Sequence, residues 1–200
     1  MRQHVADVAA VIRKLDAGPV HLVGHSRGGS LALYVARNHA ELVRTLTLAE
    51  PGMPAFHPVE TAAATATRES TLIAAAALLD RGRVDEALAS LQIGGPGTWQ
   101  AGPEEYRQML RDNVWTLKGM IQDRGDNWDT FTCADAGHIA APVLVIGGEK
   151  SPAQRGKSLD ALQSCLKRSE RAVIVGVGHP MPRLNPAGFS EAVLRFITKH

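Results

Sequence analysis

Four short runs of β-branched and aliphatic residues recur along the chain, at 20–23, 45–48, 143–146 and 172–175. The third is apolar throughout, as strands buried on both faces of a parallel sheet are. Apolar positions spaced three and four apart predict helices between and beside these runs, over about 5–15, 30–37, 152–167 and 186–197. Strands that alternate with helices in this way predict an α/β fold, a parallel sheet with flanking helices.

The stretch from residue 52 to residue 138 has a different pattern. It is rich in alanine, shows no strand, and predicts helices over about 59–79, 84–91 and 103–120. We therefore expect two parts: a core formed by 1–51 and 139–200, and an inserted helical cap formed by 52–138. The cap is expected to cover a substrate pocket.

A glycine-rich turn follows the first predicted strand and begins the next helix. It reads Gly24-His25-Ser26-Arg27-Gly28-Gly29 and contains the pattern G-x-S-x-G. At a sharp strand-to-helix turn, this pattern holds a serine hydroxyl clear of the sheet as a nucleophile. Gly24 and Gly28 are expected to remove side chains that would collide there. The helix N-terminus beneath Ser26 offers partial positive charge to an oxyanion.

A serine nucleophile needs a base, and His179 is the best candidate among eight histidines. It follows the last predicted strand on Gly176-Val177-Gly178, at the sheet edge where parallel α/β folds place their sites. A solvated loop histidine is the alternative interpretation. His25 adjoins Ser26, but neighbouring side chains at such a turn point apart. We expect His25 to pack beside the turn, where it contributes to the oxyanion or substrate site.

The charge, the apolar runs and the cysteines of the chain argue against several kinds of partner. The net charge is +2 from 22 basic and 20 acidic residues, which gives no argument for a nucleic-acid or anionic membrane partner. The longest apolar run, 72–79, is too short to span a bilayer, and the first residues lack an apolar signal core. Cys133 and Cys165 follow no metal spacing and are expected to be free thiols in a reducing compartment. These observations predict a soluble, cytoplasmic protein without a metal.

Taken together, three segments resemble the α/β-hydrolase family: the nucleophile turn at 20–29, a late strand and acid loop at 142–150, and a histidine loop at 177–186. The resemblance extends over nearly the whole chain. It implies hydrolysis of an ester or related acyl bond through a serine acyl-enzyme, without an organic cofactor. It also implies that the N–H of Arg27, the residue after the nucleophile, binds the oxyanion.

The acid of the expected triad departs from the family's usual pattern. The usual aspartate falls on Ser151, which precedes Pro152 and is expected to cap the following helix. Some relatives place the acid one strand earlier, where this chain has Glu50. Glu50 is the preferred partner of His179, and Glu149 is the reserve. A salt bridge at the cap hinge is the alternative role for Glu50.

The resemblance also implies several strands and a second oxyanion loop before the nucleophile, where this sequence has one helix. The first strand would then be a sheet edge with unpaired backbone groups. Either the chain is a truncated gene product, which we favour, or the edge pairs with a second copy in a homodimer.

These expectations lead to one main hypothesis and two alternatives. The main one is a hydrolase that acts on a small hydrophobic ester, lactone or amide through Ser26, His179 and Glu50. One alternative is a catalytically silent, ligand-binding member of the family. The other is an acyltransferase that uses the same serine.

Overall fold

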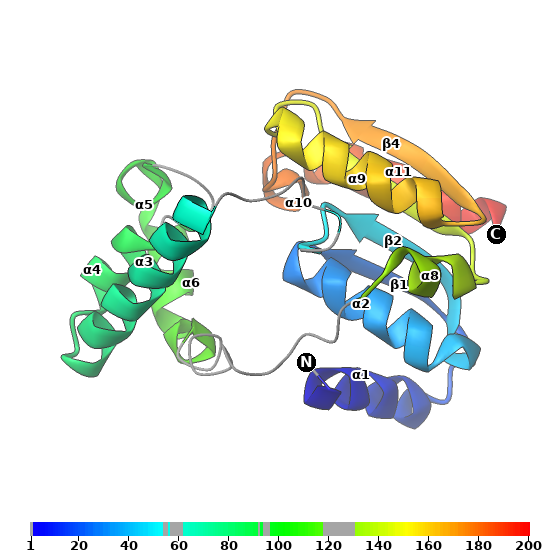
Figure 1. Ribbon diagram of the computed structural model, residues 1–200, viewed down its shortest axis with the longest axis horizontal. Coiled ribbons are helices and arrows are strands. Elements are labelled where there is room, and N and C mark those ends of the chain that lie inside the picture. The colour runs from blue at the N-terminus through cyan, green and yellow to red at the C-terminus, as the bar shows by residue number, and fades with distance from the viewer. Residues whose placement is uncertain (1, 54–55, 57–61, 92, 94–96, 118–130) are drawn as a thin grey trace. The chain divides into compact units, whose positions relative to one another are not determined.

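The computed structural model describes residues 2–53, 56, 62–91, 93, 97–117 and 131–200. It contains a four-stranded parallel sheet in the order β1-β2-β3-β4 (Figure 1). The strands are β1 Val20–His25, β2 Val43–Ala49, β3 Val143–Gly148 and β4 Ser169–Ile174. The predicted parallel α/β fold is confirmed, and each predicted strand overlaps an observed one.

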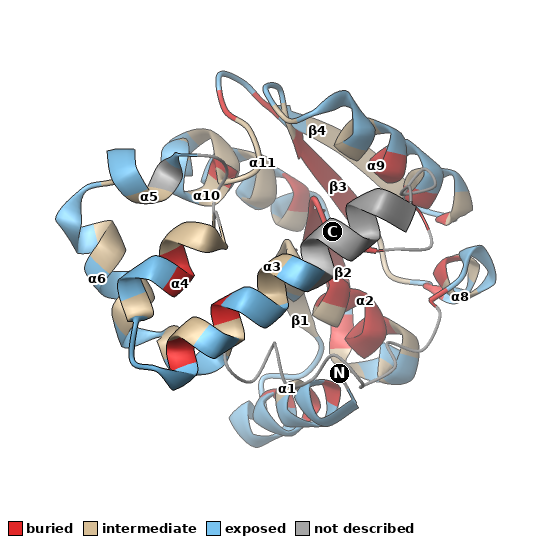
Figure 2. Cartoon of the chain, turned by 60° about the vertical axis from the view of Figure 1, so that its left-hand side comes forward, coloured by how far each residue is buried: buried red, intermediate tan, exposed pale blue. Residues whose placement is uncertain are grey.

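Helices cover both faces of this sheet. They are α1 Arg2–Leu15, α2 Arg27–Asn38, η1 Ala40–Leu42, α8 Cys133–His138, α9 Ala153–Cys165, α10 Met181–Leu184 and α11 Pro186–Lys199. One core cluster combines residues of α1, α2, α8 and α9 with inward residues of the strands, such as Leu46, Leu48 and Val145. The other combines alternate strand residues, such as Ile146, with Met181 and Phe196 of α10 and α11. Figure 2 shows these buried positions along the strands and the inner sides of the helices.

The chain divides into two compact units, Val59–Asn127 and the remainder, Met1–Pro58 with Trp128–His200. The smaller unit contains α3 Ala62–Asp80, α4 Val84–Ser90, α5 Thr98–Ala101 and α6 Glu104–Asp112, and buries Ala75, Leu79 and Ala87 against one another. It lies inside the insertion predicted at 52–138. Met53, Phe56 and Phe131 fall within those predicted limits but are buried in the core cluster of the larger unit. The predicted helix ends at 59–61 and 118–120 lie outside the described residues.

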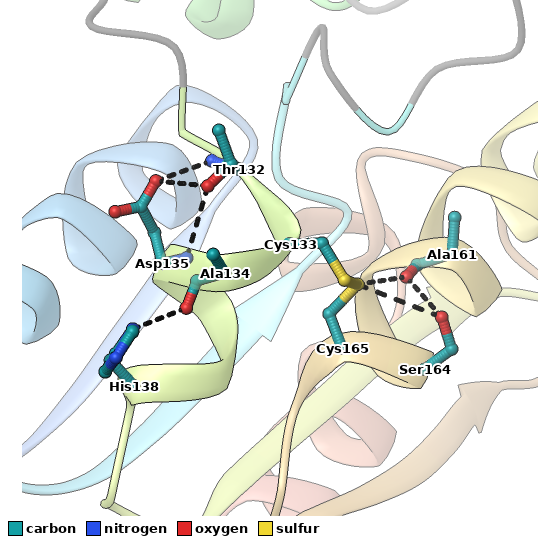
Figure 3. Close-up of a disulfide and its surroundings, with 8 residues drawn as sticks. All are labelled: Thr132, Cys133, Ala134, Asp135, His138, Ala161, Ser164 and Cys165. Carbon is teal, nitrogen blue, oxygen red and sulfur yellow. Dashed lines mark hydrogen bonds between the residues drawn. A yellow bond between two sulfur atoms is a disulfide. The ribbon is translucent and has the colours of Figure 1, made fainter.

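Cys133 and Cys165 form a disulfide, so the expectation of free thiols is wrong. The bond joins the first residue of α8 to the last residue of α9, and the two Cα atoms lie 5.2 Å apart (Figure 3). A capping box between Thr132 and Asp135 starts α8 beside it. The sequence separation of 32 concealed this proximity, which comes from the packing of α8 against α9. The argument for a reducing compartment therefore has no support.

Reduction of this disulfide is expected to lower the free energy of unfolding by about 2–4 kcal/mol, because the bond closes a long loop in the unfolded chain. Urea denaturation with and without dithiothreitol measures the effect. A Cys133→Ser/Cys165→Ser variant should unfold at the urea concentration of the reduced chain, and its midpoint should be the same with and without dithiothreitol. Equal midpoints for the oxidised and reduced chain would show that the bond contributes no stability.

The strand β1 forms one edge of the sheet, and its residue Val23 is 43% exposed. Pairing of this edge with a second copy stays a prediction. Within the described part of the chain, no helix has the length and apolar character needed to cross a bilayer.

Candidate active site

Ser26 occupies the turn between β1 and α2. Its φ of 54° and ψ of −122° lie in a region that residues with a side chain rarely adopt, which marks a strained backbone. Its N–H donates to the carbonyl of Ala49 over 2.9 Å and so ties the turn to the end of β2. The turn therefore projects Ser26 from the carboxyl edge of the sheet, where parallel α/β folds place their sites.

The three glycines of the turn differ in how much space the fold leaves for a side chain. A Cβ atom at Gly24 would lie 2.4 Å from the Gly28 carbonyl oxygen and 2.6 Å from the Gly29 Cα, both backbone atoms. A Cβ at Gly29 would lie 3.1 Å from Pro51. At Gly28 it would meet nothing within 4 Å, so the expected collision at that position is wrong. Close approach of strand and helix therefore requires glycine at position 24, whereas a side chain at position 29 would be tight. Gly28 only contributes the backbone that Gly24 faces.

His179 lies between Ser26 and Glu50. Its Nε2 is 3.0 Å from the Ser26 Oγ, and its Nδ1 is 2.7 Å from the Glu50 Oε2. A carboxylate can only accept, so Nδ1 carries the proton and Nε2 accepts from the serine hydroxyl. The three side chains come from the ends of β1 and β2 and the loop after β4. The structure thus brings together the serine, histidine and glutamate that the sequence singled out.

Glu50 is held in place from several sides. It is 2% exposed, and its Oε1 accepts the N–H of Gly148 over 2.9 Å. The Arg155 Nε lies 3.7 Å from the Oε2 that faces His179. Burial by itself raises the pKa of Glu50, but the hydrogen bonds from His179 and Gly148 bring that pKa below its ordinary value. The carboxyl group is therefore ionised at neutral pH and can stabilise a positive imidazole.

Glu149 has a different position. Its Oε2 accepts the N–H of Gly176 over 2.8 Å, at the start of the loop that carries His179. It therefore anchors that loop, and it is Glu50 that contacts the imidazole.

Ser151 does not cap α9, so that expectation is wrong. Pro152 occupies the N-cap position and no side chain caps the helix. The Ser151 hydroxyl is instead buried near Glu50, where it makes no hydrogen bond of ordinary geometry. The Ser151 N–H donates to the carbonyl of Gly148 over 3.0 Å.

The loop of His179 packs directly against the end of β3. A Cβ at Gly148 would lie 2.7 Å from the carbonyl oxygens of Val177 and Gly178, so only glycine fits there. The N–H of Lys150 donates to the Val177 carbonyl over 2.8 Å. These contacts bring the loop across the sheet edge toward Ser26. Sequence reasoning missed Gly148, although a glycine at the end of a strand signals such an approach.

His25 and Arg27 flank the nucleophile. The His25 Nε2 is 2.7 Å from the carbonyl oxygen of His179, and the two rings are 4.7 Å apart between centroids. His25 thus lies against the candidate base, beside the turn as expected. Arg27 is the first residue of α2, so its N–H lies at the positive end of a 12-residue helix. Its role toward an oxyanion stays a prediction.

Arg155 was not predicted, since an arginine in the first turn of a helix resembles an ordinary surface residue. In the described part of the chain, no three histidine, cysteine, aspartate or glutamate side chains are grouped so that they could hold a metal ion.

The sequence profile of the α/β-hydrolase fold matches residues 1–185. The chain belongs to the α/β-hydrolase fold family. A comparison with curated protein sequences found no match.

Solved structures of this family are similar to the chain throughout. MenH from S. aureus has a TM-score of 0.73 at 18% identity, over 98% of this chain and 74% of that one. Est816, described as an N-acyl homoserine lactone degrading enzyme, has a TM-score of 0.69 at 21% identity, over 97% and 73%. Rv0554 from Mycobacterium tuberculosis has a TM-score of 0.66 at 23% identity, over 98% and 71%. At these identities the likeness establishes the shared fold.

Proposed function

We propose that this chain is a serine hydrolase that cleaves an ester or related acyl bond of a small hydrophobic substrate through an acyl-enzyme. The observation that carries the proposal is the continuous chain of hydrogen bonds from the Ser26 hydroxyl through His179 to Glu50. The strained backbone of Ser26 supports it, since such strain persists chiefly at functional sites.

In the first half of the reaction, the Ser26 Oγ attacks the substrate carbonyl while its proton passes to the Nε2 of His179. Glu50 stabilises the resulting imidazolium through Nδ1–H and keeps the ring in its productive tautomer. The N–H of Arg27 and the N-terminus of α2 stabilise the negative oxygen of the tetrahedral intermediate. When that intermediate collapses, the imidazolium gives its proton to the leaving group and the acyl group stays on Ser26.

In the second half, water takes the place of the leaving group. His179 accepts a proton from the water as it attacks the acyl-enzyme, and then returns that proton to the Ser26 Oγ. The acid is released and the three side chains regain their starting protonation states.

Labelling with a fluorophosphonate probe tests the proposal. The folded chain is expected to react and to turn over a short p-nitrophenyl ester, because both need an activated serine. Mass spectrometry should locate the adduct on Ser26 and not on nearby Ser30, whose hydroxyl donates to the Gly52 carbonyl. Ser26→Ala should be blank in both assays.

The other outcomes are also informative. A folded wild-type chain that neither labels nor turns over would overturn the proposal and favour a catalytically silent ligand-binding protein. Labelling with a product that forms only when an alcohol or amine acceptor is added would favour an acyltransferase.

A further inference from the structure

We propose that His25 is a positioning residue, which holds the backbone of His179 so that the imidazole meets the Ser26 hydroxyl. Its effect on catalysis rests on the function proposed above, whereas its effect on the His179 loop does not. His25 was expected only to pack beside the turn and to contribute to the oxyanion or substrate site.

The hydrogen bond between the two residues has a defined direction. The carbonyl oxygen of His179 can only accept, so the His25 Nε2 carries the proton and donates it over 2.7 Å. The rings lie at 39° to each other with centroids 4.7 Å apart, so contact between the rings accompanies the bond. One side chain thus restrains both the backbone and the imidazole of His179.

The donor is itself rigidly placed. His25 is the last residue of β1, paired in register with Ala49 of β2, and it directly precedes Ser26. The bond from His25 therefore fixes the position of His179 relative to the backbone segment that carries Ser26. A misplacement of about 1 Å between reacting groups can lower a rate about 100-fold, so such a link has a function.

The bond from His25 meets the loop at a different point from its other hydrogen-bonded anchors. The anchors from Glu149 and Lys150 act on Gly176 and Val177, before the loop reaches His179. Gly178, whose carbonyl packs against the end of β3, separates those anchors from the base. The bond from His25 acts after that residue, at position 179 itself.

The charge state of His25 suits this role. Burial lowers the pKa of His25, and the neighbouring groups that influence it are His179, Glu50 and Arg155. A neutral His25 retains the Nε2–H donor and places no second cation beside His179 when that ring becomes an imidazolium.

The test compares His25→Phe, His25→Asn and His25→Gln in the full chain. Phenylalanine keeps a ring without a donor, asparagine has an amide too short to reach, and glutamine places an amide N–H near the position of Nε2. His21→Phe is the matched control, since His21 lies on the same strand and bonds to the Thr45 hydroxyl 2.8 Å away. That control should lose stability without losing the positioning of His179.

The first readout does not depend on activity. In chain labelled with ¹⁵N-histidine, the low-field proton on the His179 Nδ1 reports its bond to Glu50. This resonance should broaden through faster solvent exchange in His25→Phe and His25→Asn, and stay sharp in His25→Gln and His21→Phe. An unchanged resonance in His25→Phe would overturn the proposal, and so would equal behaviour of the Asn and Gln variants. That second comparison decides even where the Phe variant does not fold.

The second readout is ester hydrolysis. We expect kcat to fall about 10- to 100-fold in His25→Phe with little change in KM, and to recover in His25→Gln. A rise in KM alone, with kcat retained, would overturn the positioning role and favour a role in substrate binding. If the wild type shows no serine-dependent turnover, the proposed function fails while the resonance still tests His25.

Discussion

Glu50→Gln is expected to lower kcat for ester hydrolysis about 10⁴-fold, with KM nearly unchanged. Glutamine has the size of glutamate and can still accept the N–H of Gly148 through its amide oxygen. It has no charge to stabilise the His179 imidazolium, and its NH₂ group favours the tautomer whose Nε2 carries a proton. Such a ring cannot take the proton of Ser26. Steady-state kinetics with a p-nitrophenyl ester measure the loss.

Glu149→Gln is the matched control for this prediction. Glu149 contacts the backbone N–H of Gly176, and a glutamine oxygen can accept that bond as well. We expect kcat to stay close to that of the wild type. A large loss of kcat in Glu149→Gln, with kcat retained in Glu50→Gln, would show that Glu149 and not Glu50 is the acid that acts with His179. Circular dichroism of both variants establishes that each is folded.

Gly24→Ala is expected to destabilise the protein by about 3 kcal/mol or more. The added methyl group would lie 2.4 Å from the carbonyl oxygen of Gly28, and the atoms it meets belong to the backbone of α2. The strand and the helix would have to move apart, which disturbs the turn that carries Ser26. Urea denaturation measures the change in the free energy of unfolding.

Gly28→Ala is the control within the same motif. Its methyl group would meet nothing within 4 Å, and alanine favours a helix over glycine by about 1 kcal/mol. We therefore expect a change in stability within about 1 kcal/mol of the wild type. Comparable destabilisation by both substitutions would contradict the close approach seen at Gly24.

The elements of the fold could be predicted from the sequence because their signals are local. Apolar runs and helical periodicity predicted the strands and most of the helices to within a few residues. The single helix predicted over 103–120 is wrong in its length, because α6 ends at Asp112. The turn around Ser26 was predicted because its glycines and serine lie next to one another between a strand and a helix. The short helices α5, α8 and α10 were missed, since four to six residues are too few for a periodic pattern.

The relations between distant segments required the tertiary structure. From the sequence, Glu50 and Glu149 were both candidates for the partner of His179, since each follows a strand of the same sheet. The paths of two loops place one glutamate at the imidazole and the other at the backbone of Gly176. The disulfide escaped prediction for the same reason, because its cysteines meet only through the packing of α8 on α9.

The sequence by itself therefore determined the parallel α/β architecture, the strand-to-helix turn at Ser26 and the set of residue types from which a nucleophile and a base could be chosen. The tertiary structure decided which acid contacts the base, which glycine of the turn is sterically required, and how His25 meets His179. Periodicity and turn chemistry act between neighbours along the chain, whereas these choices depend on distances of a few ångströms between segments that only the packed sheet brings together.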